Sequence, residues 1–250
     1  MKIIPLSEGS FTVDATKKFI PFRLSEDEMS SRSHGSLLVE IQPFLILTSK
    51  DILLLDTGLG FNHQSGDQMQ LIAHLAANGI QSGDVTKVLM SHLHKDHTGG
   101  MVNPATGKPT FENATYYIQE REAAFAREKD GPSYDFSKVE PVLAGNVTLL
   151  KADEGSIDDY IHYQVTGAHS RFHQVFWIRE AEEILFFGAD DAPQYQQMKH
   201  RFAAKYDYDG KKAMELRSKW WEEGKTEGWQ FLFYHDTRKP VARPDKEADL

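Results

Sequence analysis

The sequence predicts an α/β sandwich, because strand and helix patterns are mixed along all 250 residues. Apolar runs bounded by turn-forming residues recur from residue 37 to residue 234. Amphipathic helical patterns lie between several of these runs. No repeat, low-complexity tract or clear linker divides the chain, so we expect a single domain over residues 1–250.

The first half of the chain predicts strands, a helix and a further strand. Residues 37–47 and 52–55 carry strand patterns around a short turn, which delivers Asp56 to a loop. Residues 68–77 place apolar side chains at helical spacing and stop at Asn-Gly, a common helix end. Residues 85–90 form the next predicted strand. Because ligands bind beyond the carboxyl ends of strands in open α/β sheets, the residues after position 90 are candidates for a site.

The second half predicts a longer series of strands with two helices. A strand at 115–118 leads into a charged helix with the sequence QEREAAFAREK. Residues 130–145 are polar and punctuated by Pro and Gly, as expected of a surface excursion or a flap over a site. A helix is expected at 210–223, with the Trp220-Trp221 pair in the core. The remaining predicted strands are 147–150, 161–165, 174–178, 184–187 and 230–234.

Composition favours a small-molecule substrate. With 28 basic and 37 acidic residues the formal charge is −9, so the chain lacks the basic footprint that nucleic acids or anionic membranes favour. No apolar run approaches the ~20 residues of a membrane helix, and no secretory signal is evident. We therefore expect a cytoplasmic monomer or homodimer without nucleic-acid or membrane partners. The absence of cysteine means that any metal is held by nitrogen and oxygen.

The segment VLMSHLHKDHTGG, at residues 88–100, carries the strongest chemical signal. His92, His94, Asp96 and His97 fall close together directly after a predicted strand. Imidazole and carboxylate are common metal ligands, and structural histidines rarely crowd in this way. On a tight turn the first two histidines can face one side and the last two ligands an adjacent one. One loop can thus supply ligands to two neighbouring cations, although a two-metal site needs further ligands from other parts of the chain.

The H-x-H-x-D-H motif resembles the signature of the metallo-β-lactamase-fold hydrolases, and the likeness extends over most of the chain. LLLDTG at 53–58 is similar to the family's strand and Asp before the motif. VTGAHSRFHQVFWI at 165–178 resembles the segment of its third His ligand. ILFFGADD at 184–191 and FLFYHD at 231–236 resemble the ends of its last two ligand-bearing strands. The resemblance implies a four-layer αβ/βα sandwich.

The resemblance also implies a ligand set. Asp190 would bridge two metal ions, and Asp56 would support the cluster by anchoring a ligand from behind. Asp191 is the rival bridge, and we prefer Asp190 because it falls where the family's Asp falls after the apolar run. The chain departs from the family pattern at Arg171, which would reshape one wall of the pocket. One metal would be held by His92, His94 and His169, and the other by Asp96, His97 and His235.

Within the family, the chain most resembles the lactonases of N-acyl homoserine lactones, which implies a mechanism. A hydroxide bridging two divalent ions would attack a lactone or ester carbonyl, with Asp96 and Asp190 as catalytic residues and Asp96 orienting the hydroxide. Those enzymes place a Tyr three residues after the bridging Asp, where this chain has Pro193. Tyr195 is therefore a candidate for contacting the substrate, with packing as the alternative. The ligands favour zinc, and manganese, iron or cobalt are alternatives.

Other functions and several residue roles stay open. The same site would serve a thioesterase of the glyoxalase II kind or a phosphodiesterase, because a fold does not fix a substrate. A non-catalytic metal-binding protein is the alternative of another class. His34 and His63 either reach the cleft or lie on the surface. Arg171 is either a surface charge or a clamp for a substrate carboxylate, and His173 is a packing or supporting residue.

Overall fold

The computed structural model describes residues 1–60 and 69–244, which form two six-stranded sheets and one three-stranded sheet. The first sheet contains, in spatial order, β1 (Lys2–Pro5), β5 (Phe44–Leu47), β6 (Ile52–Leu55), β7 (Lys87–Leu89), β8 (Thr115–Gln119) and β9 (Val147–Leu150). The second contains β10 (Glu154–Ile157), β11 (Ile161–Val165), β12 (Gln174–Glu180), β13 (Glu183–Phe187), β14 (Gln230–Leu232) and β15 (Val241–Ala242). The third contains β3 (Phe19–Pro21), β2 (Gly9–Val13) and β4 (Leu37–Ile41).

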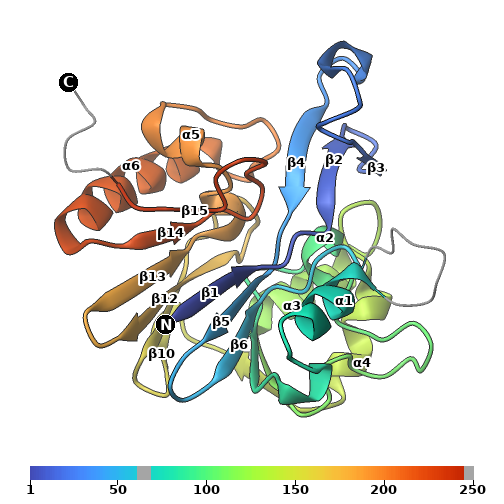
Figure 1. Cartoon of the computed structure of the whole chain (residues 1–250), viewed down its shortest axis with the longest axis vertical. Coiled ribbons are helices and arrows are strands. Elements are labelled where there is room, and N and C mark those ends of the chain that lie inside the picture. The colour runs from blue at the N-terminus through green and yellow to red at the C-terminus, as the bar shows by residue number, and fades with distance from the viewer. Residues whose placement is uncertain (61–68, 245–250) are drawn as a thin grey trace.

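Helices cover the outer faces of the two large sheets (Figure 1). The α-helices are α1 (Gln70–Ala77), α2 (Lys95–Thr98), α3 (Glu120–Glu128), α4 (Glu140–Leu143), α5 (Tyr195–Lys199) and α6 (Gly210–Glu227). Short 3-10 turns are η1 (Met29–Ser31), η2 (Ser82–Asp84), η3 (Phe136–Lys138) and η4 (Ala189–Asp191). Helices α1, α3 and α4 lie on the side of the first sheet, and α5 and α6 on the side of the second (Figure 1). The four layers confirm the predicted α/β sandwich.

Side-chain alternation along the strands explains the four layers. In β6, Leu53 and Leu55 pack toward the second sheet, whereas Leu54 packs toward α1. In β12, Phe176 faces the first sheet and Trp177 faces α6. Successive side chains of a strand point to opposite faces, so a strand that is apolar on both faces is buried between two layers. Burial of each large apolar side chain stabilises the fold by about 1.5–3 kcal/mol.

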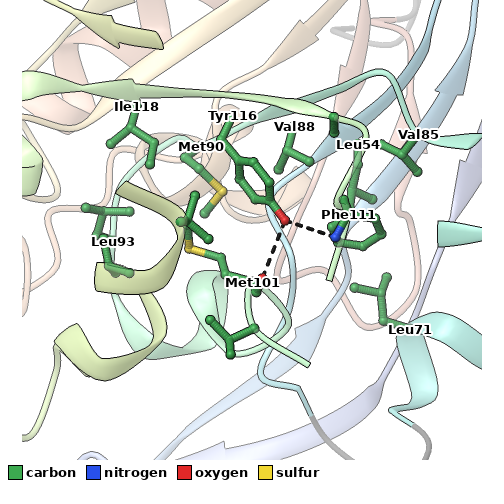
Figure 2. Close-up of a cluster of buried hydrophobic side chains, with 14 of the residues drawn as sticks. Leu54, Leu71, Val85, Val88, Met90, Leu93, Met101, Phe111, Tyr116 and Ile118 are labelled. Atoms are coloured by element: carbon green, nitrogen blue, oxygen red, sulfur yellow. Dashed lines mark hydrogen bonds between the residues drawn. The ribbon is translucent and has the colours of Figure 1, made fainter. Parts of the chain in front are cut away.

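The core between the first sheet and its helices also holds the loop after the histidine motif. Tyr116 on β8 is buried there among aliphatic side chains (Figure 2). Its hydroxyl accepts a hydrogen bond from the Phe111 amide at 3.2 Å and donates to the Met101 carbonyl at 3.4 Å. Burial raises the pKa of Tyr116. The loop after α2 is thereby anchored to the sheet.

Parallel strands place several loop residues at one edge. Strands β6, β7, β8 and β9 are mutually parallel, and β14 runs parallel to β13. The residues after β6, β7, β13 and β14 therefore emerge where ligands bind in such sheets. No helix in the described part is long and apolar enough to cross a membrane.

The N-terminal region differs from the sequence expectation. Strands β1, β2 and β3 were not predicted, and the expected strand at 37–47 is divided at Gln42-Pro43 between two sheets. Proline lacks an amide donor, so a strand does not continue through this position. Strands β2, β3 and β4 extend away from the body of the molecule (Figure 1).

Two further segments differ from expectation. Residues 130–145 are not a wholly exposed excursion, because Phe136, Val139 and Val142 are buried against the first sheet. Helix α6 continues to Glu227, past the predicted end at residue 223, and stops at Gly228 with φ 73°. The expected helix at 68–77 is described from Gln70, and position 68 lies outside the described residues.

Candidate metal centre

Seven predicted site residues converge from the ends of strands in both large sheets. His92 and His94 come after β7, and Asp96 and His97 lie on α2. The others are His169 between β11 and β12, Asp190 in η4 after β13, and His235 after β14. Each segment follows an apolar strand, and its polar side chain points toward those of the other segments. His97 is fully buried, and none of the other six except His94 is more than 8% exposed.

Two groups of three potential ligands lie side by side. In the first group, His94 Nδ1 lies 2.9 Å from His92 Nε2 and 3.2 Å from His169 Nε2. In the second, Asp96 Oδ2 lies 3.6 Å from both His97 Nε2 and His235 Nε2. Within each group one ligand atom per residue falls within 4.8 Å of the others, which is compact enough to surround a single cation.

Asp190 lies between the two groups. Its Oδ1 is 3.2 Å from His97 Nε2 and 2.9 Å from His235 Nε2, and its Oδ2 is 3.2 Å from His169 Nε2. The neighbouring Asp191 points elsewhere: it accepts a hydrogen bond from the His169 amide at 2.7 Å and lies 3.0 Å from His173 Nδ1. The geometry therefore favours Asp190 over Asp191 as the carboxylate shared by both groups.

The outer nitrogens of the imidazoles are anchored. His97 Nδ1 lies 2.7 Å from Asp56 Oδ2, and the same carboxylate accepts hydrogen bonds from the amide and hydroxyl of Ser91. His169 Nδ1 lies 2.9 Å from Asp207 Oδ1, and His235 Nδ1 lies 2.7 Å from the Glu40 carbonyl. Such contacts fix ring orientation and tautomer, which leaves the inner nitrogens free to act as ligands.

Burial and mutual charge set the protonation of the centre. Burial lowers the pKa of His92 and His94 well below 6.5, and neighbouring imidazoles add to the effect. Burial also opposes the charged form of His97, but three neighbouring carboxylates outweigh it and raise the pKa of His97 well above 6.5. Burial disfavours the Asp190 carboxylate, and three imidazoles outweigh it and hold its pKa well below 3.8. Neutral imidazoles and ionised carboxylates are the forms that bind metal ions, so His92, His94 and Asp190 already favour the binding form, whereas a metal ion would have to displace a proton from His97.

Two buried atoms test whether a cation fits the centre. Among the described residues, His97 Nε2 and Asp190 Oδ1 are buried, and neither has a partner in hydrogen-bond geometry although they lie 3.2 Å apart. An unsatisfied buried polar group costs about 1–3 kcal/mol, and more when it is charged. A cation between the two groups would satisfy both atoms, so the donor set and its geometry fit divalent metal ions.

A cavity of about 660 Å³ opens beside the centre. Five of the seven residues contribute to its lining: His94, Asp96, His169, Asp190 and His235. A further part of the lining comes from the three-stranded sheet, in which only β4 falls within a predicted strand, through Val13, Phe19 and Val39. Arg171 and Pro193 also line the cavity.

Tyr195 does not line this cavity. Its side chain is 6% exposed and packs in the apolar cluster beneath α6, where its ring contacts Trp221 and Phe233 edge-on. This position corresponds to the packing alternative. Three other tyrosines, Tyr134, Tyr206 and Tyr208, do line the cavity, and burial raises the pKa of Tyr206 to about 12.

Of the remaining candidates, His34 and His173 are not part of the cavity lining. His173 is fully buried beside Asp191 and acts as support for the loop of His169. His34 is exposed and is not part of the lining. His63 lies outside the described residues.

Sequence patterns missed two carboxylates near the centre. Asp207, which holds His169, comes after no apolar run that would mark it. Glu122 on α3 is 1% exposed and accepts a hydrogen bond from the Leu93 amide at 3.1 Å and from the Tyr134 hydroxyl at 3.2 Å. In the sequence Glu122 lies within a charged helix and is indistinguishable from a solvated residue.

Comparison with known proteins places this centre in a family. The model of the Metallo-beta-lactamase superfamily matches residues 40–190. A curated relative, the N-acyl homoserine lactonase AttM of Azorhizobium caulinodans, is 36% identical over 124 residues, which cover 43% of this chain and 41% of the relative. The chain therefore matches about two fifths of the length of that relative.

Solved structures share the fold over nearly the whole chain. A probable metal-dependent hydrolase from Staphylococcus aureus superposes with a TM-score of 0.77 at 22% identity, covering 98% of this chain and 93% of the other. AidC, a dizinc quorum-quenching lactonase solved with a product, superposes with a TM-score of 0.73 at 17% identity, covering 96% and 89%. Together with the family match, these structures confirm the fold expected from the histidine motif.

Proposed function

The chain belongs to the metallo-beta-lactamase superfamily of metal-dependent hydrolases, and from this premise we propose that it uses two divalent ions to hydrolyse a lactone or ester. The observation that carries the proposal is the position of Asp190, whose two carboxylate oxygens face different groups of imidazoles. A carboxylate placed in this way suits two adjacent cations better than one.

Each of the two groups of ligand residues would hold one ion. His92, His94 and His169 would hold one ion, Asp96, His97 and His235 the other, and Asp190 would contact both. Imidazole and carboxylate ligands without thiolates favour zinc, with manganese, iron and cobalt as alternatives. The description of AidC as a dizinc enzyme supports zinc.

The residues of the chain would hold the reacting groups in position and exclude bulk water from the centre. Bound cations in such a centre make a water nucleophilic near neutral pH and polarise the substrate oxygen. Asp96 faces both the centre and the cavity, so its carboxylate would orient the attacking water. Buried partners such as Asp56 and Asp207 keep the imidazoles in place while the substrate binds.

The lactone or ester preference rests on the relatives and on the cavity. AttM and AidC are named as lactonases, and the cavity has a largely apolar wall that would bind an acyl or ring substituent. A small-molecule substrate fits a cavity of this size. Cytoplasmic location and a monomeric or dimeric state stay predictions.

The test combines metal analysis with a substrate panel. Protein purified without chelators is analysed by elemental mass spectrometry and assayed on acyl-homoserine lactones, S-lactoylglutathione and bis-p-nitrophenyl phosphate. We expect about two metal ions per chain and hydrolysis of a lactone. His94→Ala should lose metal and activity, whereas His74→Ala, on the distant helix α1, serves as the matched control.

Three outcomes would change the proposal. Failure to bind metal after addition of zinc, manganese or iron would overturn it. If only the thioester or the phosphodiester is hydrolysed, the proposed metal centre stands and the proposed lactone or ester substrate is wrong. Full metal content without turnover would favour a metal-binding protein.

A further inference from the structure

Four cationic side chains line the cavity, and each comes from a different segment. Lys17 lies between β2 and β3, Arg32 lies before β4, Lys95 begins α2, and Arg171 lies between β11 and β12. We call these four residues the cationic rim. The acidic residues of the lining are Asp96 and Asp190, and both face the imidazoles of the centre.

No residue of the cationic rim forms a salt bridge within the described part of the chain. Arg171 lies over the Tyr208 ring at 5.9 Å, and Lys95 over the Phe19 ring at 5.7 Å. Arg32 donates a hydrogen bond to the Met29 carbonyl at 3.4 Å. The charges of the rim are therefore not neutralised by carboxylates in direct contact.

The cationic rim gathers four positive charges around one cavity of a chain with a net negative charge. The chain has more acidic than basic residues, and on α6 three lysines pair with glutamates one turn away. Like charges that gather around one cavity repel one another unless an anion compensates them. Four cations around one cavity therefore favour an anionic ligand there.

Aromatic side chains lie between the cations. Phe19, Phe125, Phe202, Tyr206 and Tyr208 all contribute to the cavity wall. Tyr208 is 63% exposed and Phe202 is 42% exposed, so both are accessible to a ligand. A ligand for this cavity would combine an apolar segment with a negative charge.

We propose that the substrate of this hydrolase carries a carboxylate remote from the bond that is cleaved, and that the cationic rim binds this carboxylate. The inference rests on the proposed function, because the cleaved bond must reach the metal centre. The inference goes beyond the activity for which the relatives are named. Of two lactones with the same ring and chain length, the enzyme would prefer the anionic one. Arginine and lysine at the cavity both attract such a group and orient it.

A matched pair of substrates tests the preference. N-hexanoyl-homoserine lactone ends in a methyl group, and N-(5-carboxypentanoyl)-homoserine lactone ends in a carboxylate at nearly the same length. We expect kcat/KM to be about tenfold higher for the carboxylate at low ionic strength, with the difference shrinking as salt screens the rim. Equal kcat/KM values, or a preference for the methyl compound, would overturn the inference.

Charge-matched double variants locate the effect. Lys17→Met with Arg171→Gln removes two rim charges, whereas Lys18→Met with Arg201→Gln removes two exposed charges outside the lining. The ratio of kcat/KM between the two lactones should fall at least ~5-fold in the rim variant and stay within about twofold in the control. Equal ratios in the two variants would assign the preference to overall charge and overturn the inference.

Binding of non-hydrolysable lactams separates this inference from the proposed function. The same acyl pair on a homoserine lactam is titrated calorimetrically into metal-loaded protein. Tighter binding of the carboxylate lactam, lost in the rim variant, would support the cationic rim even if neither lactone is hydrolysed. Equal or undetectable binding of both lactams would overturn it, whatever the outcome for hydrolysis. If bis-p-nitrophenyl phosphate outcompetes the carboxylate lactam, the rim recognises phosphodiesters and the carboxylate assignment is wrong.

Discussion

Two adjacent aspartates show how a single position in the chain decides what a carboxylate does. Asp190 and Asp191 both lie in the short turn η4, which begins at Ala189 with φ 42°. This left-handed backbone is unfavourable for a residue with a side chain, and the two carboxylates that follow it make different contacts. Asp190 faces the imidazoles of both groups, whereas Asp191 holds the His169 loop through a backbone amide.

Isosteric variants should separate these roles. Asp190→Asn removes the charge shared by both groups, so we expect fewer than two bound ions and a kcat at least ~100-fold lower. Asp191→Asn should keep most of the metal but lower the free energy of unfolding by about 1–3 kcal/mol, because it leaves His173 without its charged partner. Elemental analysis, steady-state kinetics and urea unfolding measure these effects. Full metal content in Asp190→Asn would show that Asp190 does not join the two ions.

At the scale of elements, helix α6 links the outer layer to the centre. Asp209 caps its first turn by accepting a hydrogen bond from the Lys212 amide at 3.0 Å. The residues just before the helix are bound to the His169 loop, where the Tyr208 amide donates to the His169 carbonyl at 2.9 Å. Within the helix, buried Arg217 donates to the Asp191 carbonyl at 3.0 Å. Packing of α6 on the second sheet thus positions one side of the site.

The end of α6 offers a clean stability test. Gly228 has φ 73°, and a Cβ added there meets no atom within 4 Å, so Gly228→Ala should cost only the backbone strain of about 1–2 kcal/mol. Gly228→Asn should cost less, because asparagine tolerates this conformation. Gly224→Ala is the contrasting variant, since its Cβ would collide with the Phe231 ring and should cost more. Urea midpoints with unchanged slopes measure all three, and an unaffected Gly228→Ala would contradict the assigned helix end.

At the scale of the whole molecule, polar contacts join the two large sheets at both ends of β6. Asp56, after the strand, reaches the candidate metal centre, to which both sheets contribute residues. Asp51, before the strand, binds Lys87 of the first sheet and the Tyr160 hydroxyl of the second. Lys87 also lies 3.0 Å from Asp158, in the turn between β10 and β11 that also holds Tyr160. Between these ends the sheets meet through a cluster of apolar side chains.

Local sequence patterns were enough to predict the candidate metal ligands but not the residues that support them. His92, Asp190 and His235 could be found because each comes after an apolar strand run at the spacing of a known motif. Asp207 could not, because its relation to His169 depends on the packing of α6 and not on neighbouring residues. The N-terminal wall of the cavity was missed for the same reason: β2 and β3 are short, and their strand character comes from pairing within the three-stranded sheet.

The contact between Asp51 and Lys87 predicts a pH dependence. Burial disfavours the Asp51 carboxylate, but Lys87, Tyr160 and Thr86 outweigh this and lower its pKa below 3.8. A depressed folded-state pKa stabilises the fold above the unfolded value, and this contribution is lost as the pH falls through the folded-state pKa. Asp51→Asn should therefore unfold at lower urea than the wild type at pH 7, with the gap closing below pH ~4. Exposed Asp159→Asn is the control, and a gap independent of pH would contradict the expected titration.

Metal removal should weaken the molecule as a whole, because the proposed ligands come from both sheets. His92, His94, Asp96 and His97 come from the first sheet's loops, whereas His169, Asp190 and His235 belong to the second. A cation held only by the folded chain stabilises it by about 2.7 kcal/mol at a hundredfold excess over its Kd and about 4.1 kcal/mol at a thousandfold excess. We expect chelation to lower the urea midpoint and added zinc to restore it, with a smaller response in Asp190→Asn and His94→Ala. Identical unfolding of metal-free and zinc-loaded protein would mean that no cation joins the two sheets, and the proposed centre would then have to be abandoned.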